Sequence, residues 1–346
     1  MRATGDTTPG ALCAVALLVA AFLSCSCTNP DGLPVRLPNG APGIGFDDLR
    51  YSTALHRILA PAGRSGRLAL VDPESLEVTS ITGFSESGQY DGGHDFGATS
   101  VDEGDGLLFV TDRTSGRLTV LDSMTHAVLG SARIGAGPDY VRFVAATHEV
   151  WVTEPGASRI EVFSVPANGD RTPVAAGTIH VDNGPESLVI DASSGRAYTH
   201  RWQASTVVID VTSRDVSAEW PNGCASSRGL AVDEDRQLFF AGCSEGTVSV
   251  LDAAHDGRIL SSIARGTGFD VIGYNPTLGH LYAAGTACAC LVVLDVSRTG
   301  ALSFLGRFDA PSSAHCAIAD DRGHAWVCDP DGGRLLRVTD PYPSSR

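Results

Sequence analysis

Residues 94–122, HDFGATSVDEGDGLLFVTDRTSGRLTVLD, form the stretch that decides the fold class. Three short apolar runs, at residues 97–101, 107–111 and 118–121, are separated by Asp/Gly and Thr/Ser/Gly clusters that are typical of tight turns. A fourth apolar run, at residues 127–134, ends at a glycine-rich break, after which the pattern starts again. These features predict a meander of four antiparallel strands.

The same unit occurs seven times along the chain. Its third strand is expected to end at Asp72, Asp122, Ser164, Asp210, Asp252, Asp295 and Thr339, with successive spacings of 50, 42, 46, 42, 43 and 44 residues. A unit of this length cannot bury both of its faces alone, so neighbouring units must stack. Because the apolar residues show no 3.6-residue period, a solenoid of helix pairs is excluded. The sequence therefore predicts an all-β, seven-bladed β-propeller of four-stranded blades.

Several units resemble the repeat of the YVTN-type seven-bladed β-propeller family, which runs roughly as Pro-x-Gly-Val-Ala-Val, Leu-Tyr-Val-Thr-Asn and Thr-Val-Ser-Val-Ile-Asp. Residues 228–232 (RGLAV) match its first strand, residues 110–112 (VTD) and 152–154 (VTE) its second, and residues 247–252 (TVSVLD) its third. The resemblance covers about residues 33–346 and implies the propeller fold. It implies little about activity, because this family is a scaffold with several uses.

The last unit lacks an outer strand of its own, since only YPSSR follows Pro341. Residues 33–37, LPVRL, precede the first unit and have the apolar character of such a strand. We therefore expect this N-terminal strand to pair with the last blade. That pairing would close the ring and remove an open sheet edge.

The first 24 residues have the features of a secretory signal peptide. Arg2 provides a short basic region, residues 11–23 are apolar but too short to span a bilayer comfortably, and a Ser/Cys cluster follows. The sequence therefore predicts an exported protein.

The Ser/Cys cluster contains a candidate site of lipidation. Residues 22–25, FLSC, resemble a bacterial lipobox, in which Cys25 is lipidated and becomes the mature N-terminus. Cys27 is the alternative, and ordinary cleavage without lipidation is the other interpretation. Residues 25–32 would then form a tether and residues 33–346 the propeller. The expected location is the outer membrane as a lipoprotein, or otherwise the periplasm or cell surface.

The composition and charge of the chain exclude several classes of partner and of chemistry. The formal net charge is −15 and the sequence has no lysine, which excludes Schiff-base and lysine-base chemistry. Excess negative charge argues against nucleic acid and against electrostatic attachment to anionic lipid, so a membrane would be reached only through the lipid anchor. Neither a Gly-x-Ser-x-Gly elbow, nor His-Glu-x-x-His, nor a nucleotide-binding glycine loop is present.

The loops that enter the inner strands are expected to meet at one end of the central channel. Aligning the units places the following eight residues there, which we call the funnel residues: Asp47, His94, Asp95, Asp139, Glu186, Arg228, Asp270 and His315. The loops after the second strands add Asp112, Glu154, His200 and Asp329 on the same side. The loop at residues 85–93 would overhang this funnel. Three roles are open for the cluster: a purely structural one, ligand binding and catalysis.

Carboxylates and imidazoles converging on one funnel are the donors that a divalent cation requires. The candidate ligands are Asp95, Asp139, Glu186 and Asp270, for Ca²⁺ through oxygen, or for Zn²⁺ or Cu²⁺ with histidine added. The same carboxylates would suit a general base, as in propeller lactonases. Arg228 could instead neutralise them or bind an anionic ligand.

Six cysteines lie in the last three blades, namely Cys224, Cys243, Cys288, Cys290, Cys316 and Cys328. Because an exported protein meets an oxidising compartment, we expect disulfides Cys224–Cys243 and Cys316–Cys328, each worth about 2–4 kcal/mol. Cys288 and Cys290 are open to more than one interpretation: a short disulfide, exchange with neighbouring thiols, or thiolate ligands of a soft metal near His315.

From these observations we rank three candidate functions, with the one that the sequence favours most given first. The first is a non-enzymatic binding or interaction scaffold, expected to be monomeric, that holds a protein, peptide or small molecule at the funnel. The second is a cation-dependent hydrolase or lactonase that uses the funnel carboxylates. The third is copper or redox handling through the Cys/His residues.

Overall fold

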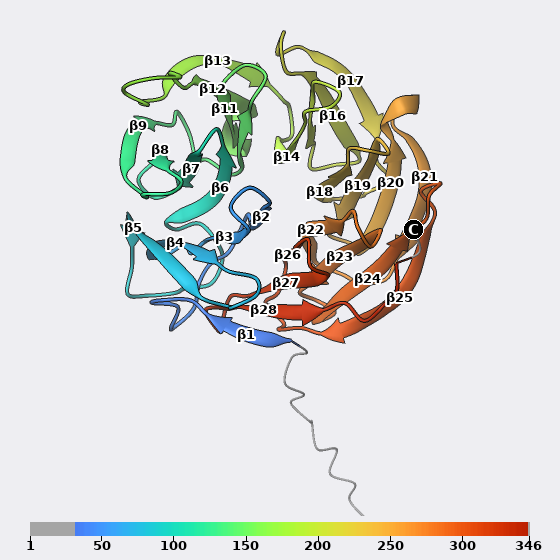
Figure 1. Cartoon of the computed structure of the whole chain (residues 1–346). Coiled ribbons are helices and arrows are strands. Elements are labelled where there is room, and N and C mark those ends of the chain that lie inside the picture. Colours follow the sequence, from blue (N-terminus) through green and yellow to red (C-terminus); the bar gives the residue numbers. More distant parts are fainter. Residues whose placement is uncertain (1–31, 345–346) are drawn as a thin grey trace, which may run out of the picture.

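A computed structural model describes residues 32–344 of the chain as a ring of seven four-stranded antiparallel sheets around a central channel (Figure 1). The predicted seven-bladed β-propeller is confirmed. The expected signal peptide, Cys25 and all but the last residue of the expected tether fall outside the described residues. Within those residues, no helix is long and apolar enough to cross a membrane.

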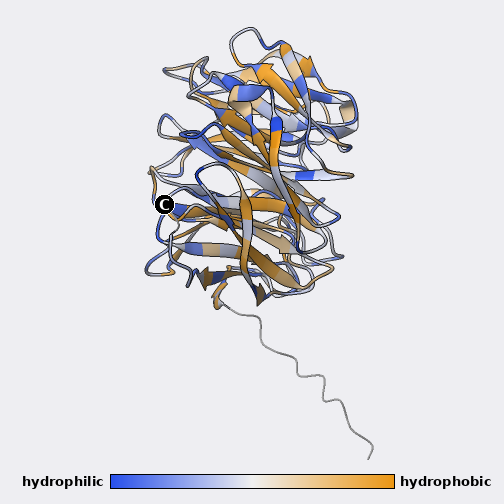
Figure 2. Cartoon of the chain, turned by 90° about the vertical axis from the view of Figure 1, so that its right-hand side faces the viewer, coloured by the Kyte–Doolittle hydropathy of each residue, from blue (hydrophilic) through white to orange (hydrophobic). Residues whose placement is uncertain are grey.

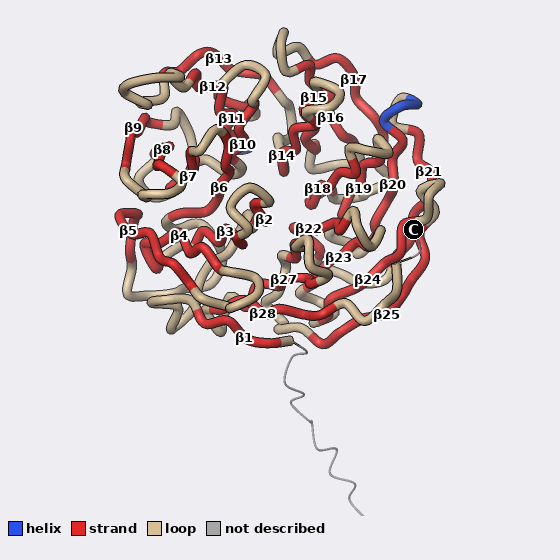
Figure 3. Tube along the Cα trace, viewed as in Figure 1, coloured by secondary structure: helices blue, strands red, loops and turns tan. Residues whose placement is uncertain are grey.

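Each blade runs in chain order from its inner to its outer strand, and the outer strand of blade 7 comes from the N-terminal end of the described chain. Blade 1 comprises β2 (Arg50–Ser52), β3 (Arg57–Pro61), β4 (Ser65–Val71) and β5 (Val78–Glu86); blade 2 comprises β6 (Ala98–Gly104), β7 (Leu107–Asp112), β8 (Arg117–Asp122) and β9 (Val128–Arg133). Blade 3 comprises β10 (Val141–Val144), β11 (Glu149–Glu154), β12 (Arg159–Ser164) and β13 (Val174–His180); blade 4 comprises β14 (Glu186–Asp191), β15 (Arg196–His200), β16 (Ser205–Asp210) and β17 (Val216–Pro221). Blade 5 comprises β18 (Ser227–Asp233), β19 (Leu238–Cys243), β20 (Thr247–Asp252) and β21 (Arg258–Ala264); blade 6 comprises β22 (Phe269–Asn275), β23 (His280–Gly285), β24 (Cys290–Val296) and β25 (Leu302–Asp309). Blade 7 comprises β26 (Ala317–Ala319), β27 (His324–Asp329), β28 (Arg334–Thr339) and β1 (Leu33–Arg36). Two short 3₁₀ helices, Pro155–Ala157 and Ala253–His255, follow β11 and β20 (Figure 3).

Burial along the strands follows their place in the blade. The second strands β7, β11, β19 and β23 are buried at every residue, because both of their faces pack against neighbouring blades. The outer strands β13 and β17 are mostly exposed. Apolar residues accordingly concentrate along the strands in Figure 2. The apolar core is therefore divided into clusters that lie between neighbouring blades.

The strand β1 closes the ring as predicted. It pairs antiparallel with β28, from Leu33 opposite Arg337 to Arg36 opposite Arg334 (Figure 1). Val35 and the following Leu37 are 4% and 5% exposed and belong to the core between the first and last blades. The chain then turns at Gly40, where an added Cβ would come within 2.2 Å of the carbonyl oxygen of Gly333.

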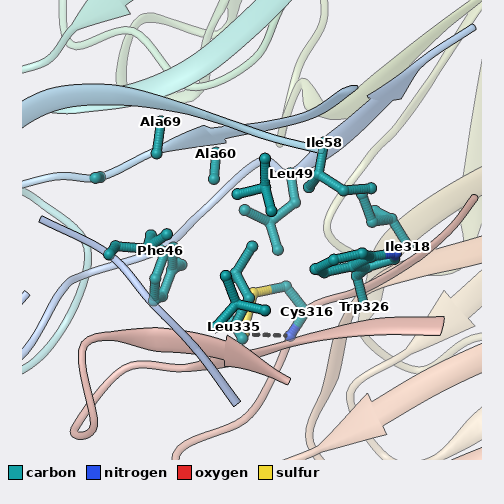
Figure 4. Close-up of a cluster of buried hydrophobic side chains, with 14 of the residues drawn as sticks. Phe46, Leu49, Ile58, Ala60, Ala69, Cys316, Ile318, Trp326 and Leu335 are labelled. Carbon is teal, nitrogen blue, oxygen red and sulfur yellow. Dashed lines mark hydrogen bonds between the residues drawn. A yellow bond between two sulfur atoms is a disulfide. The ribbon is translucent and has the colours of Figure 1, made fainter. Parts of the chain in front are cut away.

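The core at the closure point joins residues from both ends of the chain. Phe46, Leu49 and Ile58 from the first blade pack with Trp326 and Leu335 from the last (Figure 4). The predicted Cys316–Cys328 disulfide lies in this cluster (Figure 4). The two termini of the fold are therefore held by a strand pair and by a common apolar core.

Candidate ligand-binding funnel

The structure places the eight funnel residues at or just before the start of the inner strands, in two groups of contacts. Asp47 lies 3.4 Å from the His94 ring nitrogen, and the rings of His94 and His315 are 5.9 Å apart between centroids. Glu186 lies 4.0 Å from the guanidinium of Arg228. Asp95 and Asp139 join the first group through Arg113, which is described next. The backbone N–H of Asp270 donates to the carbonyl of His315 at 3.2 Å.

The centre of the first group is Arg113, which the sequence analysis missed. Its Nη2 donates to Asp47 at 2.9 Å and to Asp139 at 2.6 Å, and its Nη1 donates to Asp95 at 3.1 Å. Its Nε donates to the backbone carbonyl of Pro138 at 2.8 Å. The available signal was its position directly after β7, in a loop that the repeat places on the funnel side. Arg113 therefore neutralises part of the acidic cluster, for which the sequence analysis had proposed no cation other than Arg228.

Asp47, His94 and Arg113 form the charged half of the funnel. Burial alone would raise the pKa of the Asp47 carboxyl, but the neighbouring His94 and Arg113 outweigh burial and lower this pKa to about 2. The Asp47 carboxylate in turn raises the pKa of His94 to about 9. At neutral pH this half contains fixed ion pairs and a positively charged imidazole.

Three other carboxyl groups of the funnel, those of Asp139, Glu186 and Asp270, have raised pKa values. Burial, with the nearby charges of Asp47 and Glu186, raises the pKa of Asp139 well above its ordinary value. Burial and the charge of Asp270 raise the pKa of Glu186 to about 7, although the indole nitrogen of Trp202 donates to its Oε2 at 2.6 Å. Burial also raises the pKa of Asp270. Asp139 is paired with Arg113 at 2.6 Å, whereas Glu186 has among the described cations only the 4.0 Å contact with Arg228.

Arg228 differs from Arg113 in having few partners for its guanidinium. In the described residues its guanidinium makes one hydrogen bond, to the adjacent Ser227 carbonyl at 3.3 Å, and the long pair with Glu186. Its side chain is 33% exposed, against 15% for Arg113. Most of its N–H donors are therefore free to bind an acceptor from outside.

A cavity of about 450 Å³ opens beside Arg228. Its lining includes His94, Asp270 and His315, with Tyr90 from the loop at residues 85–93. As expected, this loop borders the funnel, because its residues Tyr90, Gly92 and Gly93 line the cavity. Tyr90 also packs against Gly43, where an added Cβ would lie 2.2 Å from its ring. Such a volume is within the range of small-molecule sites.

Four further residues expected on the funnel side are engaged elsewhere. Asp112 accepts hydrogen bonds from the backbone of Ser85 and Ser115. Glu154 pairs with Arg159, and Asp329 pairs with Arg334. Burial lowers the pKa of His200, which is fully enclosed, to about 4. These contacts hold hairpins and neighbouring blades together, so these four residues are structural.

The predicted metal ligands do not converge in this structure. Among residues 32–344, three ligand atoms within 4.8 Å of one another occur only in the groups His315, Cys316, Cys328 and Cys224, Cys243, Glu245. Neither group includes Asp95, Asp139, Glu186 or Asp270, and the Asp95 side chain is 91% exposed. Both ring nitrogens of His315 face backbone carbonyls, those of Ser313 at 2.9 Å and Phe46 at 3.0 Å. A cation site in the funnel would need these side chains to move.

All six cysteines of the last three blades form disulfides. The predicted pairs Cys224–Cys243 and Cys316–Cys328 are confirmed, and Cys288 and Cys290, which the sequence left open, are joined to each other. Each of the two groups with converging ligand atoms contains one of these bridges. In this oxidised form their sulfurs are not thiolate ligands.

Removing the Cys224–Cys243 bridge by a double substitution to alanine is expected to lower the free energy of unfolding by about 3 kcal/mol, because it frees a loop of 19 residues in the unfolded chain. The matched Cys288→Ala/Cys290→Ala variant opens a separation of only 2 residues and should have a much smaller effect. Denaturant unfolding under oxidising conditions measures both. Equal effects of the two variants would contradict this account.

Glu186 predicts a specific pH dependence of stability. Its pKa is raised to about 7 from the ordinary 4.5, so its contribution is fully present below pH 4.5 and is lost as pH rises through 7. Glu186→Gln, which keeps an acceptor for Trp202, should therefore unfold at higher denaturant concentration than the wild type at pH 8. Near pH 4 the two proteins should be alike. A Glu186→Gln effect that is the same at both pH values would contradict the assignment.

Comparisons with known proteins bear on the fold. No family model matches the chain, and no curated protein matches its sequence. Solved structures do match: a chain of a mitotic checkpoint complex (TM-score 0.70, 13% identity, covering 98% of this chain and 99% of that one) and the β-propeller domain of Cps50 (Swd1) from Myceliophteria thermophila (TM-score 0.69, 11% identity, 89% and 99%). A third is hydrazine synthase of Kuenenia stuttgartiensis (TM-score 0.67, 13% identity, 87% and 96%). At these identities the likeness establishes the propeller fold alone.

Proposed function

We propose that this β-propeller is an exported, lipid-anchored member of the YVTN-type family that acts as a monomeric binding scaffold through its funnel. Export and the anchor at Cys25 rest on the apolar N-terminal segment and the FLSC box. The family rests on the strand motifs of the repeat. The binding role rests on the geometry of the funnel.

The observation that carries the binding role is the presence of Arg228 and Asp270 in the lining of the 450 Å³ cavity. Arg228 has free donors, Asp270 is a buried carboxyl with a raised pKa, and Glu186, whose pKa is also raised, lies 4.0 Å from Arg228. A ligand that offers an acceptor to Arg228 and a donor to the carboxyls would satisfy both at once. We infer that the ligand is polar and carries both kinds of group, as a peptide segment or a protein loop does.

Affinity capture from an envelope extract tests this role with matched variants of the full protein. Arg228→Gln is expected to reduce recovery of a specific partner about tenfold, since a charge-assisted hydrogen bond is lost. Arg307→Gln, on the exposed outer strand β25, should bind as the wild type does. Direct titration of the recovered partner against both variants then gives the affinities. Equal affinity of the Arg228→Gln and Arg307→Gln variants would exclude the funnel as the binding site.

A cation-dependent hydrolase is the second candidate, and one observation favours it. A carboxyl with a pKa of about 7, such as Glu186, is suited to act as a general base at neutral pH. This function requires a lactone or ester substrate to be turned over with a divalent cation present. Turnover should fall at least about a hundredfold in Glu186→Gln. Turnover that is unchanged by this substitution, or by removal of divalent cations with a chelator, would exclude this mechanism.

A further inference from the structure

Arg228 and Asp270 occupy equivalent positions in neighbouring blades. Each is the second residue of an inner strand, Arg228 in β18 of blade 5 and Asp270 in β22 of blade 6. The two strands touch at this point, since a Cβ added at Gly229 would lie 2.2 Å from the backbone carbonyl oxygen of Asp270. Both side chains line the cavity of about 450 Å³ in the funnel. They therefore enter one cavity from adjacent points of the backbone.

The side chain of Asp270 lacks a partner in the described part of the chain. Its backbone N–H donates to the carbonyl of His315 at 3.2 Å, but its carboxyl group takes part in neither a hydrogen bond nor an ion pair within residues 32–344. Burial raises the pKa of this carboxyl, with Asp47 adding to the effect and Arg228 among the groups that oppose it. The charge of Arg228 thus reaches Asp270, although the two groups are not bonded to each other.

The guanidinium of Arg228 contacts a carboxylate on the opposite side, in blade 4. Its Nη1 lies 4.0 Å from Oε2 of Glu186, and this oxygen already accepts the indole N–H of Trp202 at 2.6 Å. No other carboxylate of the described residues pairs with this guanidinium. Arg228 and Asp270 are therefore a cation and an anion that share a cavity without neutralising each other.

The other charged groups of the lining are already accounted for. His94 is held by Asp47, whose Oδ2 lies 3.4 Å from its Nδ1. Both ring nitrogens of His315 face backbone carbonyls. Asp331 is exposed, so water solvates its charge. The cation and the anion described above are therefore the charged groups that remain for a ligand.

The rest of the lining suits a small organic body. The rings of Tyr90 and Phe269 form part of it. The hydroxyl oxygen of Ser313, which also lines the cavity, is buried and has no hydrogen-bond partner among the residues that the structure describes. A hydroxyl can donate to a carboxylate or accept from an ammonium group, and a buried one without a partner is costly. The cavity therefore offers apolar contact and one further hydrogen bond.

A ligand that completes both charges must itself carry both. Its carboxylate would accept from the free donors of Arg228, and its ammonium group would donate to Asp270. Because these two side chains start from touching strands, the two charges of the ligand must lie a short distance apart. Such a ligand leaves neither of its own charges, and neither charge of the lining, buried without a partner.

We propose that the funnel recognises a compact zwitterion, in which a carboxylate and an ammonium group lie a few bonds apart. The carboxylate binds Arg228, the ammonium group binds Asp270, and the body of the ligand lies against Tyr90 and Phe269. A free α-amino acid has this chemistry, and so does a free N-terminal aspartate of a peptide or protein, through its α-ammonium group and side-chain carboxylate. The inference rests on the proposed binding role of the funnel and specifies what the ligand presents there.

Three probes of one shape test the proposal by calorimetric titration of the full protein at pH 7. L-Phenylalanine carries both charges, phenethylamine lacks the carboxylate, and 3-phenylpropanoate lacks the ammonium group. Phenylalanine is expected to bind most tightly. Loss of either charge should weaken binding about tenfold, because a charge-assisted hydrogen bond is lost each time.

Variants assign each charge of the ligand to its residue. Arg228→Gln should abolish the preference for phenylalanine over phenethylamine and keep the preference over 3-phenylpropanoate. Asp270→Asn should do the reverse. Asp331→Asn, which removes an exposed carboxylate of the same lining, is the matched control and should bind all three probes as the wild type does.

A peptide distinguishes the two sources of the zwitterion. Asp-Gly-Phe amide presents both charges at its N-terminus, whereas its N-acetylated form lacks the ammonium group. Tighter binding of the free peptide than of phenylalanine would identify the chain terminus of a partner as the source, and the reverse would identify a free amino acid. In both cases acetylation should weaken binding of the peptide about tenfold.

The inference is overturned if the three probes bind equally, if neither phenylalanine nor the free peptide binds, or if Asp331→Asn loses as much affinity as Asp270→Asn. A partner captured through Arg228 that binds Asp270→Asn and the wild type equally would also overturn it, and the scaffold role would then stand. Failure of the scaffold role is a separate result, namely equal affinity of a captured partner for the Arg228→Gln and Arg307→Gln variants.

Discussion

Removal of residues 33–38 is expected to lower the free energy of unfolding by about 3–6 kcal/mol, because the buried side chains of Val35 and Leu37 are lost at about 1.5–3 kcal/mol each. The truncation also removes the register from Leu33–Arg337 to Arg36–Arg334. The strand β28 then becomes an exposed edge, which is a template for aggregation. Denaturant unfolding, with light scattering during the transition, measures both effects.

The matched control is a chain that begins at Gly32 and so keeps β1. It should unfold at the same denaturant concentration as the full chain. Where the truncated protein cannot be purified, Val35→Asp in the full chain is the second variant, because it places a charge in the core of Figure 4 without shortening the chain. A truncated protein with the stability of the control, or a Val35→Asp protein with unchanged stability, would show that closure does not depend on β1.

The second large effect is expected for Arg142→Met, which should lower the free energy of unfolding by about 3–5 kcal/mol. Arg142 donates from Nη1 and Nη2 to the two carboxylate oxygens of Asp48 at 2.6 and 3.0 Å, and from Nε to the Leu188 carbonyl at 2.8 Å. The side chains of Arg142 and Asp48 are 6% and 2% exposed. The substitution would leave the Asp48 carboxylate buried without its cation, and a buried charge without a partner is strongly destabilising.

This pair also joins blades across the channel. Asp48 precedes β2 of blade 1, Arg142 lies in β10 of blade 3, and Leu188 lies in β14 of blade 4. The hydroxyl of Ser100, from blade 2, donates at 2.6 Å to Asp48 Oδ2, which is also the acceptor for Nη1 of Arg142. The arginine therefore connects segments that strand pairing does not connect.

Two further variants provide the controls for Arg142→Met: one adds a second substitution at Asp48, and the other breaks an ion pair on the surface. Asp48→Leu/Arg142→Met should recover most of the lost stability, because both charges are removed together. Arg322→Met breaks a pair with Glu74 whose side chains are 53% and 62% exposed, and should cost less than about 1 kcal/mol. The argument fails if Arg142→Met is no more destabilising than Arg322→Met.

The candidate site was only partly predictable, for a reason that individual residues make clear. The eight funnel residues follow from their common position in the repeat, which is a local property of each unit. Arg113 and its partner Asp47 are 66 residues apart, and Arg142 and Asp48 are 94 apart. The repeat says which blade holds each residue, but not which side chains meet across the channel. For Arg142 the available hint was a charge within the apolar run VRFV of an inner strand, where an unpaired arginine would be unfavourable.

The disulfides and the expected metal ligands show the same difference between contacts within one blade, which were predictable, and contacts between blades, which were not. Cys224–Cys243 and Cys316–Cys328 each connect positions in the same blade, where strand order already limits the distance, and both pairs are confirmed. The four carboxylates expected to hold a cation come from four different blades. Their separation depends on the width of the channel and on the cation at its centre, Arg113, which binds two of them.

The sequence by itself determined the seven-bladed fold, the closure by residues 33–37 and two of the three disulfides. The fold follows from unit spacings of 42 to 50 residues, the closure from a missing strand, and the disulfides from pairs of cysteines expected within one blade of an exported protein. Only the tertiary structure decided which charges are paired, which arginine is free and where the channel is hollow. The physical reason is that strand order follows from patterns within one unit, whereas charge pairing and cavities depend on side chains that seven units bring to a common axis.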